Sequence, residues 1–277
     1  MRLGLSSPLS HQSPADWARQ MKTLGCESVV FPLDYTRKEN DIADYADAAA
    51  AEGLTIAQVG IWRNVLAVNS AEREAARAHA LGQLRLAEQL GARCCVNISG
   101  TFGGPVWDGG YRENYSPECW QAVVEYTRSL IDAVRPVRTK YTLEPMPWMI
   151  PTGPDEYLKL LEDVDREAFG VHMDIINMIN QPARYFFPEV FMDECFEKLG
   201  SRILSCHLKD IRLLDQLTFQ LKELPCGEGV FPLQTYLDWA DRCDPDMPMI
   251  IEHLESDQEY LTALNYIKKM IRKNETV

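Results

Sequence analysis

The sequence predicts an α/β fold, a (β/α)8 or TIM barrel, on three observations. Short β-prone segments alternate with helical ones along the 277 residues, at about 30 to 35 residues per unit. No GxGxxG follows the first β-prone segment, as it would in a dinucleotide-binding sheet. Polar side chains recur at the ends of many predicted strands, which is where a barrel carries its functional residues. We therefore expect residues 1–277 to form a single (β/α)8 barrel domain.

The first half of the chain contains four of the predicted strands. They are expected over residues 2–6, 28–32, 54–60 and 93–99. Helices are expected between them over residues 14–24, 42–51 and 70–90. Ser13 and Pro14 suit the N-cap and the first position of the first helix, while Gly53 and Gly91 are suited to end the second and third. Each of the first three strands is thus followed by a helix, as parallel strands in one sheet require.

A glycine- and aromatic-rich stretch over residues 100–115 fits neither the helical nor the strand period, so we expect a long loop there. Loops of this length usually serve as lids or are disordered. Ser116 and Pro117 then start a helix over residues 118–134.

The second half of the chain supplies the other four strands. The fifth ends at Glu144, because the prolines that follow, Pro145 and Pro147, cannot lie inside a central strand. The remaining strands are expected around residues 170–177, 203–210 and 247–253. Helices over residues 153–161 and 258–271, and a glycine-rich turn over residues 225–232, complete the pattern.

Net charge, apolar stretches and cysteine positions indicate which ligands and which cellular compartment to expect. The net charge of −13 opposes binding to nucleic acid, which needs basic side chains, and favours a neutral or weakly charged ligand. The N-terminal residues form no apolar signal segment, and no stretch is apolar enough to cross a membrane, so we expect a cytoplasmic protein without a membrane partner. Cys94, Cys95 and Cys206 lie in apolar surroundings, which predicts reduced, buried thiols rather than disulfides.

Four metal-competent side chains lie at the ends of the last four predicted strands: Glu144, Asp174, His207 and Glu252. A single such residue is more often a cap or a solvated loop residue. Because the carboxyl ends of barrel strands ring one mouth, however, all four can meet there. Their oxygen and nitrogen donors suit Mn2+, Mg2+ or Co2+, and of these we expect Mn2+ as the cofactor. The pattern predicts a divalent metal site.

The residues around these positions resemble a known family. Segments 142–147, 172–174, 205–210, 227–229 and 250–253 are similar to the fifth- to eighth-strand motifs of the sugar phosphate isomerase/epimerase family of xylose-isomerase-like TIM barrels. That family includes ketose 3-epimerases, inosose dehydratases and apurinic endonucleases. The resemblance covers nearly the whole chain in element order.

This resemblance implies a function and the roles of the four residues. Glu144 and Glu252 would be both metal ligands and the catalytic acid/base pair, with Asp174 and His207 as the other ligands. The implied activity is that of a metal-dependent isomerase or epimerase that abstracts a proton next to a carbonyl of a small carbohydrate. A homodimer or homotetramer is also implied, because homo-oligomers are frequent among related barrels.

Two positions depart from the ketose 3-epimerase pattern. Those enzymes have a second glutamate shortly after the ligand that matches Glu144, whereas residues 147–150 are apolar here, and they have a histidine where this chain has Asn177. Both departures remove groups that hold sugar hydroxyls. A metal-dependent lyase, either an inosose-type dehydratase or an enzyme that cleaves 3-keto-glycosides, is therefore the runner-up. A non-catalytic sugar-binding barrel or subunit is a further alternative.

Other residues are candidates for substrate binding. Trp62, Arg63 and Trp148 suit the walls of a sugar pocket, since apolar ring faces match the C–H faces of sugars, although packing would also explain them. His172 is either a substrate contact or a structural residue beside Asp174. The predicted substrate-binding residues are His172, Lys209, Trp62, Arg63, Trp148, Asn177 and His11.

Overall fold

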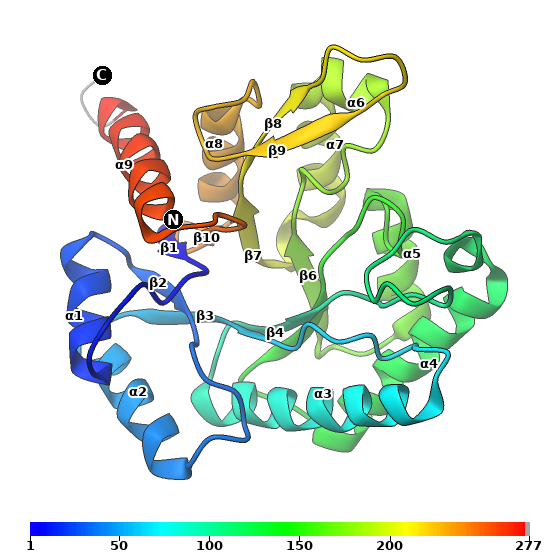
Figure 1. Cartoon of the computed structure of the whole chain (residues 1–277), viewed down its shortest axis with the longest axis horizontal. Helices are drawn as coiled ribbons and strands as arrows, with labels where there is room; N and C mark the ends of the chain where they lie inside the picture. The colour runs from blue at the N-terminus through cyan, green and yellow to red at the C-terminus, as the bar shows by residue number, and fades with distance from the viewer. Residues whose placement is uncertain (275–277) are drawn as a thin grey trace.

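A closed barrel of eight parallel strands forms the centre of the computed structural model, which describes the backbone of residues 1–274 and the side chains of residues 1–271 (Figure 1). Around the barrel the strands follow the order β1, β2, β3, β4, β5, β6, β7 and β10, and β10 pairs with β1 to close the ring. The strands are β1 (Arg2–Leu5), β2 (Ser28–Val30), β3 (Thr55–Gly60), β4 (Cys94–Asn97), β5 (Lys140–Leu143), β6 (Phe169–Met173), β7 (Ile203–Leu208) and β10 (Pro248–Ile251). The predicted (β/α)8 fold class is confirmed.

Helices surround this barrel and cover its outer face (Figure 1). They are α1 (Pro14–Thr23), α2 (Glu39–Ala51), α3 (Ser70–Leu90), α4 (Pro117–Val134), α5 (Pro154–Val164), α6 (Pro182–Phe186), α7 (Pro188–Leu199), α8 (Leu233–Cys243) and α9 (Asp257–Asn274). Helix α5 buries Tyr157, Leu160, Leu161 and Val164, the spacing that places side chains on one helical face. Among the described residues, no helix combines the length and apolarity that crossing a membrane requires.

The predicted helix boundaries rest on capping residues that the structure shows in place. The Ser13 hydroxyl accepts a hydrogen bond from the backbone N–H of Asp16 at the start of α1, and the Ser116 hydroxyl accepts one from Cys119 at the start of α4. Gly91 ends α3 in the left-handed conformation, with φ of +68°, as its predicted C-cap position requires. All eight cysteines are free thiols, as expected.

A β-hairpin and several helices in the second half of the chain were not predicted. The antiparallel strands β8 (Asp210–Leu213) and β9 (Leu221–Leu224) follow β7 directly and project beyond the barrel (Figure 1). The predicted seventh strand, residues 203–210, is thus too long: the barrel strand ends at Leu208, and Asp210 already belongs to the hairpin. Helices α6, α7 and α8 fill the segments on either side of β7.

The loop predicted over residues 100–115 is present and ends in a single turn of 3-10 helix, Arg112–Tyr115. The buried side chain of Asn114 fixes this loop. Its Oδ1 accepts hydrogen bonds from the Thr101 hydroxyl (2.7 Å) and the Phe102 N–H (3.0 Å). Its Nδ2 donates to the backbone carbonyls of Gly109 and Trp148, each at 3.1 Å. The loop is therefore attached to the segment that follows β5.

Candidate metal centre

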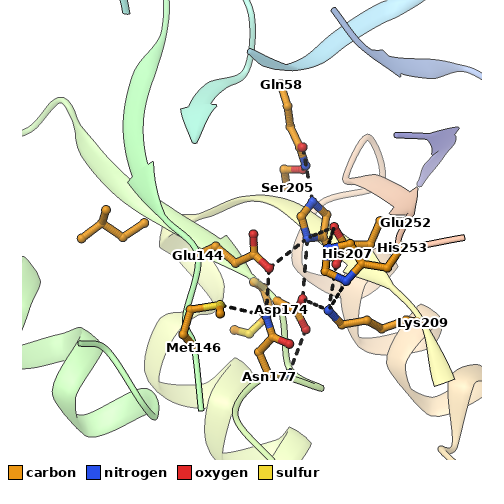
Figure 2. Close-up of polar contacts among 12 residues, drawn as sticks. Gln58, Glu144, Met146, Asp174, Asn177, Ser205, His207, Lys209, Glu252 and His253 are labelled. Atoms are coloured by element: carbon orange, nitrogen blue, oxygen red, sulfur yellow. Dashed lines mark hydrogen bonds and ion pairs between the residues drawn. The ribbon is translucent and has the colours of Figure 1, made fainter. Parts of the chain in front are cut away.

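The four predicted ligands meet at the carboxyl ends of the barrel strands (Figure 2). Glu144 directly follows β5, Asp174 follows β6, His207 lies in β7, and Glu252 follows β10. Each offers one ligand atom, and the four atoms all lie within 4.8 Å of one another. All four residues are at most 4% exposed. Segments more than 100 positions apart in sequence are brought together because parallel barrel strands all end at the same mouth.

The imidazole of His207 lies at the centre of this group. Its Nδ1 is 2.9 Å from an Oε of Glu252, 3.5 Å from Oε1 of Glu144 and 3.6 Å from Oδ2 of Asp174. Its Nε2 lies 3.3 Å from the side-chain oxygen of Gln58, whose amide nitrogen donates to the Ser205 hydroxyl at 2.6 Å. Despite its burial, the charges of Glu252 and Glu144 raise the pKa of His207 well above its ordinary value, so without a metal the ring is a cation that faces Glu252 through Nδ1 and Gln58 through Nε2. A metal ligand needs the neutral ring, and a ring that keeps its proton on Nε2, toward Gln58, would leave the Nδ1 lone pair for the ion.

The ammonium group of Lys209 balances part of the negative charge. Its Nζ is 2.7 Å from Oδ2 of Asp174, 2.8 Å from Oε1 of Glu252 and 3.3 Å from Oε2 of Glu223. The side chain is 1% exposed. Buried charges of this kind persist only when they are paired, and these carboxylates raise the pKa of Lys209 well above its ordinary value despite its burial.

The two glutamates differ in acidity. Burial and the negative charge of Glu252 raise the pKa of Glu144 to about 7. Burial also opposes ionisation of Glu252, but the positive charges of His207 and Lys209 outweigh it and lower the Glu252 pKa to about 2. Near neutral pH the cluster therefore holds one fully ionised glutamate and one close to its midpoint.

The donor set fits a hard or borderline divalent cation. Three carboxylates and one imidazole, with no thiolate, are the ligands that Mn2+, Mg2+ or Co2+ prefer. Their convergence within a buried pocket, with His207 Nδ1 directed at three carboxylates, matches the geometry of a metal site.

A cavity of about 340 Å3 lies next to the cluster and is lined by Glu144, His207 and Glu252. Trp62, one of the predicted substrate-binding residues, forms part of its wall and has a backbone φ of +50°. His172 does not reach the cavity. It is fully buried, with its ring centroid 4.0 Å from that of His207, and burial lowers its pKa well below the ordinary value. His172 thus packs as a neutral ring against His207.

Asn177 and Lys209, two of the predicted substrate-binding residues, both contact the cluster residues. The Asn177 Nδ2 donates to Oε1 of Glu144 at 2.9 Å, and its backbone N–H donates to Oδ1 of Asp174 at 3.0 Å. It therefore orients two of the candidate ligands. The ammonium group of Lys209 forms ion pairs with Asp174 and Glu252.

The remaining predicted residues lie farther from the cluster. Trp148 borders a second cavity beside it, and its indole N–H donates to the Asp108 carbonyl at 2.8 Å. Arg63 lines a separate groove along α3. His11 contacts the Leu9 carbonyl and the Tyr45 hydroxyl through its two ring nitrogens. The structure does not bring Arg63 or His11 to the cavity at the cluster.

Several residues at the site were not predicted. Gln58 was detectable as a polar residue within the apolar β3 segment. His253 directly follows Glu252, has a φ of +56°, and places its Nδ1 2.9 Å from Oε1 of Glu223. Glu223 comes from β9, and its contacts with Lys209 and His253 depend on a hairpin that the sequence pattern did not reveal.

Comparison with known proteins points to one family. Residues 18–270 match the sequence model of the family described as the xylose isomerase-like TIM barrel. No curated protein matches the chain.

Solved structures with low sequence identity share the fold. A xylose isomerase-like TIM barrel protein from Mycobacterium smegmatis in complex with magnesium is 21% identical (TM-score 0.67; 92% of this chain and 87% of that chain covered). The 3-keto-D-glucoside 4-epimerase of E. coli is 13% identical (TM-score 0.71; 97% and 99%). A probable 3-DHS dehydratase from Bacillus anthracis is 15% identical (TM-score 0.74; 97% and 99%).

Proposed function

This chain belongs to the xylose isomerase-like TIM barrel family, and we propose that it is a divalent-metal-dependent isomerase or epimerase of a small carbohydrate. The reaction would begin with removal of a proton from the carbon next to a carbonyl group. The observation that carries this proposal is the buried convergence of Glu144, Asp174, His207 and Glu252 beside a cavity. A divalent ion held by these residues would act as a Lewis acid that stabilises negative charge on the substrate oxygen.

The two glutamates have the properties of an acid/base pair. Figure 2 shows Glu144 and Glu252 on either side of His207. In the metal-free site Glu252 is ionised near neutral pH, whereas the pKa of Glu144 is raised to about 7. A bound divalent ion would favour the ionised form of both, so either carboxylate could accept a proton from the substrate. The hydrogen bond from Asn177 fixes the position of Glu144. Removal of a proton by one glutamate and return by the other would invert a carbon centre.

The cavity has the size and the walls that a monosaccharide requires. Its volume of about 340 Å3 lies at the lower end of the range for small-molecule sites. Trp62 and Trp107 both line it, and aromatic faces pack well against the C–H faces of sugars.

Exchange of substrate protons with solvent tests this proposal. The purified protein, loaded with Mn2+ or treated with EDTA, would be incubated in deuterated water with a panel of ketoses and keto-glycosides. We expect metal-dependent deuterium uptake at a carbon beside the carbonyl, detected by NMR. Bound metal without uptake from any member of the panel would contradict the proposal and favour a sugar-binding barrel or subunit.

A lyase is the second candidate, and the contacts of Asn177 favour it. Asn177 stands where ketose 3-epimerases have a histidine, and its Nδ2 donates to Oε1 of Glu144, so the imidazole of those enzymes has no counterpart at this position. The same proton abstraction followed by loss of a β-substituent would give elimination. An unsaturated product or a released aglycone in the NMR spectra would identify a lyase, whereas a stereoisomer would identify an epimerase.

A further inference from the structure

We propose that the substrate is a neutral keto-glycoside with an apolar, aromatic-sized aglycone, and that a groove beside the metal cluster binds this aglycone. The proposal rests on the function proposed above and specifies its substrate class. The hairpin groove, as we name it, has a volume of about 530 Å3. Its apolar walls are formed by Tyr115, Trp148, Ile176, Ile179, Phe219 and Leu221.

The hairpin groove adjoins the cavity at the cluster. Met146 and His253 line both spaces, so the two meet at these side chains. A monosaccharide would fit in the 340 Å3 cavity alone. A ligand that fills both spaces needs a second part attached to the sugar, and the shared residues mark where the two parts would join.

The walls of the groove indicate the chemistry of that second part. They come from four separate segments: the 100–115 loop, the segment after β5, the segment after β6 and the hairpin. Tyr115 and Trp148 leave much of their surface uncovered, at 61% and 42% exposed. Aromatic side chains that converge from several elements and remain uncovered provide a surface on which a flat apolar group would stack.

Charge argues against a phosphorylated substrate. Among the described residues that line the cavity and the hairpin groove, none is an arginine or a lysine. The nearby Lys209 is already paired with Asp174 and Glu252. A phosphate placed in the groove would lose its hydration without gaining an arginine or lysine partner.

The charged groups of the groove lie at its inner end. His253, which lines both spaces, is ion-paired with Glu223 at 2.9 Å between Nδ1 and Oε1. Asn177, another lining residue, contacts Glu144. Polar partners are thus available where the hydroxyls and the glycosidic oxygen of a bound sugar would lie, and the apolar surface begins beyond them.

Binding of two unreactive probes tests the proposal. Phenyl β-D-glucopyranoside and methyl β-D-glucopyranoside differ only in the aglycone, and neither has the carbonyl that enolisation requires. Isothermal titration with the Mn2+-loaded protein should show at least about tenfold tighter binding of the phenyl compound, because the ring buries apolar surface. Saturation-transfer NMR should show contact between the phenyl protons and the protein.

Alanine variants distinguish binding of the phenyl ring in the groove from the general effect of removing an exposed aromatic side chain. Tyr115→Ala and Phe219→Ala should each reduce the preference for the phenyl compound several-fold. Phe187→Ala is the matched control, because Phe187 is as exposed as Tyr115, at 65%, and lines neither space. The preference should be unchanged in that variant.

Several results would overturn the proposal. Equal binding of the two probes would do so, as would an equal loss of preference in Phe187→Ala. A wild-type dimer that dissociates in Phe219→Ala, seen by sedimentation, would show that a second copy covers the groove. Deuterium exchange on free ketoses without a phenyl preference would remove the groove proposal alone. A phenyl preference without exchange on any keto sugar would support the groove and remove the proposed reaction.

Discussion

Lys209 occupies a position where its ammonium group and a divalent ion would share the same carboxylates. Its Nζ is 2.7 Å from Asp174 and 2.8 Å from Glu252. Lys209→Met removes one positive charge, so we expect Mn2+ affinity to rise at least about tenfold and the metal-free protein to unfold at a lower temperature. Titration calorimetry and thermal unfolding with EDTA would measure both. Lys198→Met, at a surface ion pair with Asp155, should change neither, and unaltered Mn2+ affinity in Lys209→Met would refute this role.

The catalytic roles proposed for the two glutamates predict a different pattern of activity losses. Glu144→Gln and Glu252→Gln should each reduce deuterium exchange at least about a hundredfold, because a neutral amide cannot transfer the proton. Asp174→Asn should chiefly weaken Mn2+ binding, with activity partly restored at high metal concentration. Exchange rates and bound-metal analysis would distinguish these effects. The exposed residue Glu228 supplies the control, Glu228→Gln, and near-normal exchange in either glutamate variant would exclude the mechanism.

The raised pKa of Glu144 predicts how pH affects the metal-free protein. Its pKa rises from 4.5 to about 7 on folding, so the folded state favours the protonated form. The stabilisation is fully present below pH 4.5 and is lost as pH rises through about 7, with a magnitude of up to about 3 kcal/mol. Urea unfolding in EDTA should therefore show a steeper loss of stability across this window in the wild type than in Glu144→Gln. Parallel pH profiles would disprove this assignment.

Prediction from sequence worked for residues whose position follows from chain order. Pro145 and Pro147 mark the end of β5, so Glu144 could be placed at the barrel mouth. Gln58 and Glu223 could not be assigned in this way, because their contacts with His207 and Lys209 depend on side-chain direction and on a hairpin. Arg63 had the right residue type near a strand end, but it lines a different groove.

At the scale of elements, Asp210 holds the base of the β8–β9 hairpin to the glycine-rich turn that follows β9. Its carboxylate accepts hydrogen bonds from the backbone N–H groups of Gly227, Gly229 and Phe231, at 2.9 to 3.1 Å. Asp210→Ala leaves these donors unpaired, and we expect a loss of about 2–4 kcal/mol of stability with faster hydrogen exchange in the hairpin. Chemical unfolding and exchange mass spectrometry would measure both effects.

Asp215→Ala provides the comparison for this prediction, since Asp215 is exposed at the tip of the same hairpin. It should leave stability and exchange unchanged. Equal stability of the Asp210 and Asp215 variants would show that the carboxylate does not hold the hairpin.

Elements with strong local signals were predicted, and those without were missed. Helix α3 was placed at residues 70–90 because its sequence is rich in helix formers and ends at Gly91. The hairpin strands have four residues each, and several of their residues are polar, so their pairing comes from tertiary contacts rather than from periodicity. Helix α6, with five residues, is likewise too short to show a helical period.

At the scale of the whole molecule, the barrel topology determines where the candidate metal ligands can meet. Eight strands that all end at one mouth gather the four candidate ligands from β5, β6, β7 and β10. The net charge of −13 agrees with a neutral ligand and opposes nucleic-acid binding. A homodimer or homotetramer remains a prediction, which sedimentation would test.

The four hydrogen bonds of Asn114 also have a kinetic consequence. Because this side chain binds both its own loop and the carbonyl of Trp148, and the Trp148 indole N–H donates to the Asp108 carbonyl, the segments after β4 and β5 are joined at two points. We expect them to open together as one gate, with a single relaxation rate, instead of as two independent flaps. The product would then leave only when both segments open together. If the chemical step is fast, this opening would limit the rate of product release and hence of turnover.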